Sequence, residues 1–290
     1  MRELILMAVL LFTPVFARAD TQLYASLLPT MRSVQVGTPA TVFAAVINAG
    51  TETATAVSVA IESIIPVPLA PVDFLYQTLD SQQHLSGTPN TPVDIPPGAT
   101  RLFLLALTPQ GEIPNNSVGP PTQVLFTFQG TNTQPAPVYW GLNTLYLVAE
   151  SFHPPDLIAS PLTCPSDDGL SLTLNIPGPN GIAAFAFAIT NIGGKVSFYV
   201  FGAKNCQTNS QTGECLAPPA PSTPVTLATG ESATFSVFIF GNGQEIPFDP
   251  ANNRVRVVFL SPLPIPHVNN FYYGETSVAV RTHSPACAPS

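Results

Sequence analysis

The sequence predicts an all-β chain built from two tandem antiparallel β-sandwich domains, and three observations predict it. A long stretch occurs twice, because residues 91–148 and 223–280 carry the same landmarks in the same order. Apolar residues come in short blocks of Val, Ile, Leu and Phe, separated by Pro, Gly, Asn and Thr, which is typical of strands and turns. Beyond residue 19, no segment shows the periodicity of an amphipathic helix.

The repeat keeps a nearly constant offset of 132 or 133 positions. Three pairs of landmarks define it: Thr91 and Thr223, Glu112 and Glu245, and Gly141 and Gly274. A match over about 60 residues in which the offset shifts by only one position is hard to obtain by chance and indicates a duplicated domain. We therefore predict one domain at residues 20–150 and a second at residues 151–290, joined near the proline pair of SFHPPD.

The first 19 residues have the pattern of a secretory signal peptide. Arg2 gives the charged start, an apolar run follows, and Ala17-Arg18-Ala19 forms a small-residue cleavage site before Asp20. This run is too short to span a bilayer, and no other run approaches the required length. We expect an exported protein, periplasmic or extracellular, without a membrane span.

Charge is scarce in this chain, which has 9% charged residues, a formal net charge of −8 and 33 prolines. Binding to a phosphate backbone needs clustered Lys and Arg, so we expect no nucleic-acid partner. Disorder is also disfavoured, because apolar β-formers are frequent.

The first domain begins with TQLYASLLP as an edge strand, then TMRSVQVGTP as a strand ending in a Gly-Thr-Pro turn, then the buried strand TVFAAVIN. In TAVSVAIES, Val57, Val59 and Ile61 alternate with smaller or polar residues, which places one face on a core. FLYQTLD is predicted as a short edge strand. Three more strands are centred on residues 102–107, 124–128 and 145–148, which gives about seven strands per domain.

The second domain repeats this plan. GIAAFAFAITNIGG parallels ATVFAAVINAG, so that Asn191 and Gly193 match Asn48 and Gly50. Short strands with turns every 8 to 12 residues or so indicate a β-sandwich of the immunoglobulin-like type.

VGTPATVFAAVINAGTETATAVSVAI and PPGATRLFLLALTP resemble the immunoglobulin-like repeat modules of bacterial exported proteins, including adhesion-related and cell-surface types. CQTNSQTGECLAPPAP and PFDPANNRVRVVF are also similar to exported proteobacterial proteins. The resemblance implies a scaffold and transfers no catalytic or binding residue, since this scaffold hosts many functions.

The four cysteines all fall in the second domain, at Cys164, Cys206, Cys215 and Cys287. Export makes disulfides the expected state, and four cysteines allow three pairings. We favour a local bond between Cys206 and Cys215 and an outer bond between Cys164 and Cys287. A metal site would need CxxC spacing and nearby histidines, which the sequence lacks.

Acidic loops are the remaining lead for a metal. Asp167, Asp168, Glu245 and Asp249 are weak calcium candidates, because Ca²⁺ prefers oxygen ligands in turns. The favoured alternative is that such side chains bond to their own backbone.

Paired aromatics raise the possibility of a sugar platform. Trp140 follows Tyr139, and Tyr272-Tyr273 stand at the matching place of the second copy. Recurrence in both copies favours packing over ligand binding.

The sequence therefore predicts a non-enzymatic, exported structural or protein-binding module of the bacterial cell envelope or exterior. We expect no cofactor, and an envelope or extracellular protein as partner. The alternatives are a polysaccharide- or calcium-binding module and a hydrolase with an unrecognised site, although no known catalytic motif is present.

Overall fold

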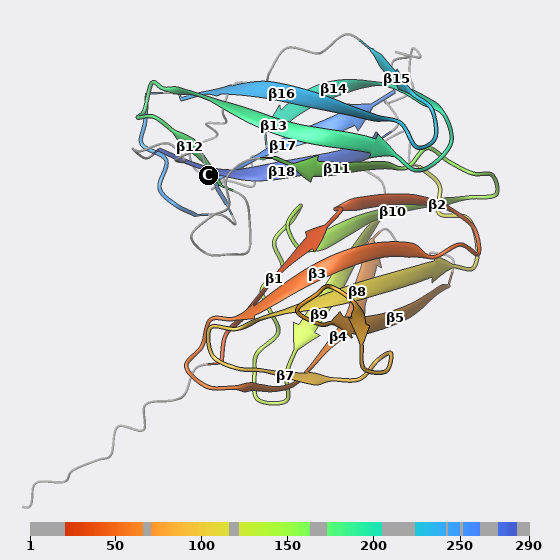
Figure 1. The fold of residues 1–290 in the computed structure, drawn as a ribbon, viewed down its shortest axis with the longest axis vertical. Coiled ribbons are helices and arrows are strands. Elements are labelled where there is room, and N and C mark those ends of the chain that lie inside the picture. The colour runs from red at the N-terminus through yellow and green to blue at the C-terminus, as the bar shows by residue number, and fades with distance from the viewer. Residues whose placement is uncertain are drawn as a thin grey trace, which may run out of the picture.

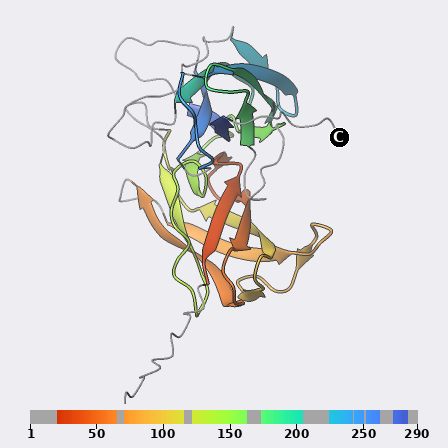
Figure 2. The ribbon, with the colours of Figure 1, turned by 90° about the vertical axis from the view of Figure 1, so that its left-hand side faces the viewer.

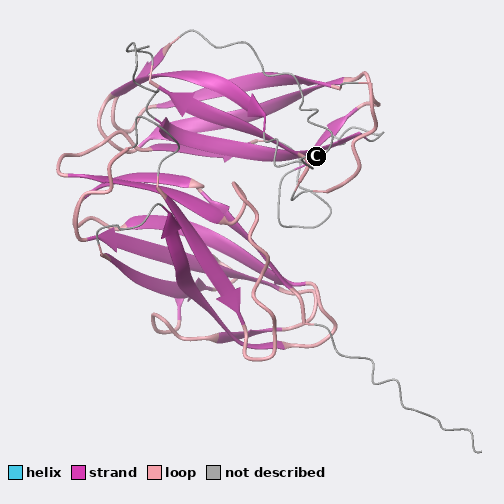
Figure 3. Cartoon of the chain, turned by 180° about the vertical axis from the view of Figure 1, so that it is seen from behind, coloured by secondary structure: helices cyan, strands magenta, loops and turns pink. Residues whose placement is uncertain are grey.

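The computed structural model describes residues 21–65, 71–115, 122–162, 173–204, 224–241, 243–249, 252–261 and 272–282. Every regular element in these ranges is a strand, which confirms the all-β prediction (Figure 3). The same ranges contain no helix with the length and apolarity needed to cross a bilayer. The four cysteines, Asp167 and Asp168 lie outside the described residues, and so do the disulfides predicted for those cysteines.

The first half of the chain forms two sheets around one apolar core. Its strands are β1 (Leu23–Leu28), β2 (Met31–Gln35), β3 (Ala40–Asn48), β4 (Ala54–Ile65), β5 (Val72–Leu79), β6 (Leu85–Ser86), β7 (Val93–Ile95), β8 (Thr100–Pro109), β9 (Gln123–Gln129) and β10 (Thr144–Glu150). One sheet has the order β1-β3-β8-β5-β6, and the other has the order β2-β10-β9-β4-β7. This is a β-sandwich consistent with the immunoglobulin-like type.

The second half repeats the strand order of the first (Figure 1). Its described strands are β11 (Leu157–Pro161), β12 (Thr173–Ile176), β13 (Ile182–Asn191), β14 (Val196–Lys204), β15 (Val225–Leu227), β16 (Ser232–Phe240), β17 (Arg254–Leu260) and β18 (Tyr272–Thr282). The order β11-β13-β16 matches β1-β3-β8, and β12-β18-β17-β14-β15 matches β2-β10-β9-β4-β7. A second apolar core lies between these sheets.

Alternation of side chains along the strands builds each core. In β3, Val42, Ala44 and Val46 are fully buried, whereas the intervening Phe43 is 52% exposed. In β4, two of the three predicted inward residues, Val57 and Val59, are buried, as the sequence pattern requires. The third, Ile61, is only partly buried against the same core, and the strand register shifts directly after it. Phenylalanine rings fill the second core, where Phe187 and Phe259 have ring centroids 6.0 Å apart.

The Asn-x-Gly turn of each half is held by the buried side chain of its asparagine. Asn48 Nδ2 donates to the carbonyl oxygens of Glu52 at 2.7 Å and Ile95 at 2.9 Å. Asn48 Oδ1 accepts a hydrogen bond from the amide of Gly50 at 3.0 Å. The second half has the same three bonds: Asn191 Nδ2 to Gly194 O (2.9 Å) and Leu227 O (3.1 Å), and Gly193 N to Asn191 Oδ1 (3.0 Å). The turn therefore ties β3 to the end of β7, and β13 to the end of β15.

Three details differ from the sequence prediction. The sandwiches are not purely antiparallel, because β2 runs parallel to β10 and β12 runs parallel to β18. The chain changes sheets between β1 and β2 at Pro29, which has no amide to donate, and this places β2 beside β10. FLYQTLD belongs to β5, which is longer than predicted and lies inside its sheet, between β8 and β6. The first half also has ten strands rather than about seven, and the very short strands β6 and β7 were not predicted.

Candidate binding site at the junction of the two halves

The two halves lie one above the other and meet where β2 lies against β11 and β18 (Figures 1 and 2). An apolar cluster forms part of this junction, with Met31, Tyr146 and Val148 from the first half and Tyr272 from the second. Beside it, Asn115 Nδ2 donates to the carbonyl oxygen of Tyr272 at 2.5 Å. The junction therefore contains both apolar and polar contacts.

A buried ion pair fastens β2 to the start of the second half. Arg32 Nε lies 2.9 Å from Asp156 Oδ2, and the two side chains are 7% and 4% exposed. The amide of Ser33 donates to the other carboxylate oxygen at 3.1 Å, and Arg32 also bonds to Thr41. Burial raises the pKa of Asp156 above its ordinary value, and the favourable contacts with Arg32 and Ser33 only partly oppose this shift.

A second buried ion pair joins β17 to β18, between Arg256 and Glu275. The Arg256 guanidinium lies over the ring of Tyr146, 5.9 Å from its centroid, which brings the first half into the contact. Burial alone would lower the pKa of Arg256, but the Glu275 carboxylate and Tyr146 together raise it above its ordinary value. Burial and the negative charge of Glu275 raise the pKa of the Tyr146 hydroxyl. Arg256 therefore stays charged, and Tyr146 stays neutral, at ordinary pH.

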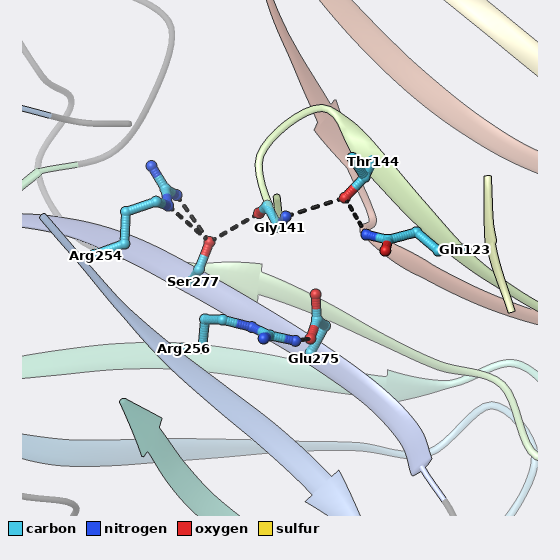
Figure 4. A network of polar contacts seen from close by, with 7 residues as sticks. All are labelled: Gln123, Gly141, Thr144, Arg254, Arg256, Glu275 and Ser277. Atoms are coloured by element: carbon cyan, nitrogen blue, oxygen red, sulfur yellow. Dashed lines mark hydrogen bonds and ion pairs between the residues drawn. The ribbon is translucent and has the colours of Figure 1, made fainter. Parts of the chain in front are cut away.

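A chain of hydrogen bonds crosses the junction through the loop before β10 (Figure 4). Arg254 Nη2 donates to Ser277 Oγ at 2.8 Å, and Ser277 Oγ donates to the carbonyl of Gly141 at 3.2 Å. On the other side of the loop, Thr144 Oγ1 accepts from the amide of Gly141 at 3.0 Å and from Gln123 at 2.8 Å. Gly141 has a φ of +73°, a backbone conformation that favours glycine.

A cleft of about 520 Å³ opens above these contacts and is lined by both halves. Its walls are mainly apolar and include Leu28, Pro29, Phe43, Ile158, Pro161 and Ile192. Leu28 and Phe43 are each 52% exposed, and Ile192 is 41% exposed. Thr276 also lines the cleft, but its hydroxyl oxygen is buried beneath the surface and has no hydrogen-bond partner in the described part of the chain.

The acidic candidates from the sequence do not gather in this cleft. Glu245 is exposed, and both carboxylate oxygens of Asp249 accept hydrogen bonds from Asn252, at 3.1 Å from its backbone amide and 2.8 Å from its side chain. Among the described residues, no three His, Cys, Asp or Glu side chains come close enough to hold a metal ion. Asp249 thus bonds within its own turn, as the favoured alternative predicted.

The aromatic candidates divide between packing and exposure. Tyr272 packs on the junction cluster, and Tyr273 packs on the second core. Trp140 is 39% exposed and directly precedes Gly141, which lines the cleft. The recurring aromatic position is therefore architectural in the second half, whereas Trp140 stands beside the cleft.

Sequence reasoning missed the charged side chains at the junction. The sequence did contain one signal for them. Arg254, Arg256 and Glu275 lie within apolar strands of a chain that has only 9% charged residues, and such charges are rarely buried unless they are paired. Arg32 and Asp156 gave no such signal, because they are 124 positions apart in the sequence.

No protein-family model matches the chain, and no curated protein sequence matches it. Among solved structures, it is similar to native Escherichia coli alpha-2-macroglobulin, with 12% identity and a TM-score of 0.28 over 90% of this chain and 17% of that chain. It is also similar to red sea bream transglutaminase, with 12% identity and a TM-score of 0.23 over 92% of this chain and 32% of that chain. A third similar structure is a chaperone–tip adhesin complex of CFA/I fimbriae, with 10% identity and a TM-score of 0.21 over 73% of this chain and 87% of that chain.

The chain spans less than a fifth of the length of the alpha-2-macroglobulin chain that it matches. Likenesses at these identities and TM-scores are too low to transfer a function. The chemistry of the cleft therefore has to be argued from this chain's own residues.

Proposed function

We propose that this chain is a non-enzymatic, exported bacterial protein of the cell envelope or exterior that binds an apolar segment of another protein. The cleft between its two domains, at residues 20–150 and 151–290, is the binding site in this proposal. The observation that carries it is the chemistry of the cleft, whose rim exposes apolar side chains while Arg32 and Glu275 in its lining are held in ion pairs.

The rim supplies the driving force for binding. Leu28 and Phe43 are neighbours across the β1–β3 pair, and each is 52% exposed. Full burial of one such side chain contributes about 1.5–3 kcal/mol, so covering both favours a complex.

The polar groups beneath the cleft support a binding role over a hydrolytic one. A nucleophilic serine needs a base that takes its proton. Ser277 instead donates to the carbonyl of Gly141 and accepts from Arg254, a cation that cannot take a proton. Glu275 is engaged by Arg256.

Export rests on the signal-peptide pattern of residues 1–19. Mass spectrometry of the protein recovered from the periplasm and from the culture medium tests this part. A mature N-terminus at Asp20 is expected in one of the two fractions. A full-length chain that stays in the cytoplasm contradicts export.

Trp140 is the only tryptophan and directly precedes Gly141, which lines the cleft, so we use its fluorescence as the probe of binding. We expect a synthetic peptide with alternating Val and Phe to shift the emission saturably. Phe43→Asp should weaken this binding by roughly tenfold, the factor that corresponds to about 1.4 kcal/mol. Leu85→Asp is the matched control, because Leu85 is 54% exposed and lies on β6, outside the cleft lining.

A peptide that leaves Trp140 emission unchanged, or that binds equally well to the Phe43→Asp variant, contradicts the proposal. Two other ligands separate the alternatives. A saturable shift with cell-wall or exopolysaccharide fragments would favour the sugar-binding alternative, for which the exposure of Trp140 is the supporting observation. A rise in melting temperature on adding Ca²⁺ to chelated protein would favour the calcium-binding alternative.

A further inference from the structure

The matching strands β8 and β16 differ in their neighbours. β8 lies inside its sheet, paired with β3 on one side and with β5 on the other. β16 pairs with β13 along nine residue positions, and no other described strand pairs with it. In Figure 1, β16 lies at the top of the molecule, on the side away from the first half. The described part of the second half therefore presents the backbone edge of a long strand.

The apolar core beneath this edge is less well covered than its counterpart. Phe103 of β8 is fully buried, and the ring of Tyr76 from β5 contacts it with a centroid distance of 6.0 Å. The matching residue of β16 is Phe235, which stays partly exposed although it contacts Phe187 and Phe198. An additional strand beside β16 would complete the cover of Phe235, as β5 does for Phe103.

The sequence of β16, SATFSVFIF, contains no charge, proline or glycine. Proteins usually protect an exposed edge with such residues, because an unprotected edge pairs with other strands. The C-terminal end of its outward face is also apolar, since Phe238 is 57% exposed and Phe240 is 47% exposed. β16 therefore has the properties of a pairing strand.

The segment that matches β5 in sequence order has a different composition from β5. Between β14 and β15, where β5 stands in the first half, residues 205–223 read NCQTNSQTGECLAPPAPST and lie outside the described residues. This segment has one large aliphatic side chain, Leu216, and no aromatic residue, whereas β5 carries Phe74, Leu75 and Tyr76. The alternating apolar residues that the edge requires are present in β16 itself.

We propose that β16 pairs antiparallel with β16 of a second copy of this chain across a twofold axis. The pairing would join the two three-stranded sheets into one continuous sheet, with β16 of each copy at its centre. With the twofold axis perpendicular to the sheet, the inward side chains of both strands point to the same side. Phe235 of each copy would then be covered by the inward side chains of the other. The dimer does not depend on a ligand in the cleft.

Sedimentation velocity of the mature protein over a range of concentrations tests this proposal, and a monomer–dimer equilibrium is expected. Ser236→Lys combined with Phe238→Lys places like charges on the pairing strand at exposed positions, so it should raise the dimer dissociation constant by roughly tenfold or more. Ile182→Lys is the matched control, because Ile182 is 54% exposed and faces Phe240 from β13, which is not an edge strand. The control should dimerise like the wild type.

Hydrogen exchange identifies the surface involved. The amides of β16 should become protected as the protein concentration rises, and the lysine variant should lose this dependence. A wild-type protein that stays monomeric overturns the proposal, whether its β16 amides are protected by another part of the chain or remain open. A dimer that survives the β16 lysines also overturns it, because the interface then lies elsewhere.

Discussion

Replacing the buried turn asparagines should destabilise each half by a similar amount. Asn48→Ala removes two hydrogen bonds to carbonyl oxygens and one from an amide. The bond to Ile95 O is buried, and a buried acceptor without a partner costs about 1–3 kcal/mol. The two less buried bonds contribute about 0.5–1.5 kcal/mol each. We expect a loss of about 3 kcal/mol, and the same for Asn191→Ala, because Asn191 makes the same three bonds.

Urea unfolding of the mature protein, followed by circular dichroism, measures both variants. Gln82→Ala is the control, because Gln82 is an exposed residue in a turn, and its free energy of unfolding should match the wild type. The double variant should show additive losses, since the two asparagines share no partner. A loss below about 0.5 kcal/mol for either asparagine would refute the reasoning, because changes of this size are typical of ordinary surface sites.

The junction yields three further predictions. Asp156→Leu should lower the free energy of unfolding by about 3–5 kcal/mol, because it leaves the buried charge of Arg32 unpaired. The double variant Arg32→Met/Asp156→Leu should recover most of this loss, and a double variant as unstable as the single one contradicts the prediction. The pKa of Asp156 is higher in the folded protein than its unfolded value of about 3.9. The carboxyl therefore contributes most to stability below about pH 3.9, and this contribution is lost as the pH rises through the folded pKa. Wild type should therefore lose stability relative to the double variant as the pH rises from about 4 through that folded pKa, which paired urea titrations measure. A constant difference in stability would count against the shift. Gly193→Ala should lower the free energy of unfolding by about 3 kcal/mol, because the new Cβ would clash with the backbone at Pro154 and Asp156. An unchanged melting temperature would contradict this, because the backbone would then have moved to accept the methyl group.

Local patterns account for what the sequence could predict. The alternation of Val57 and Val59 with exposed neighbours, and the Asn-x-Gly turns at Asn48 and Asn191, depend on a few adjacent residues, and the structure confirms them. The repeated landmarks likewise predicted a repeated strand order, which the sheets show.

Long-range geometry accounts for what was missed. No local signal distinguishes a parallel from an antiparallel neighbour for β2, so its pairing with β10 could not be predicted. The cleft depends on how the halves meet, which the contacts of Arg32 and Tyr272 determine across long sequence separations. Asp249 stays a calcium candidate by its chemistry, and in the structure its carboxylate accepts hydrogen bonds from Asn252 within its own turn.

The parallel pairing of β2 with β10 determines how the first half responds to tension. β2 lies near the start of this half and β10 at its end, and five consecutive residues of each are in register. A force that pulls the two ends apart drags these strands in opposite directions along their length, so their hydrogen bonds share the load and must break together. β12 and β18 form the same parallel pairing in the second half. A protein fixed between a cell surface and a moving partner would therefore stretch little before either half came apart.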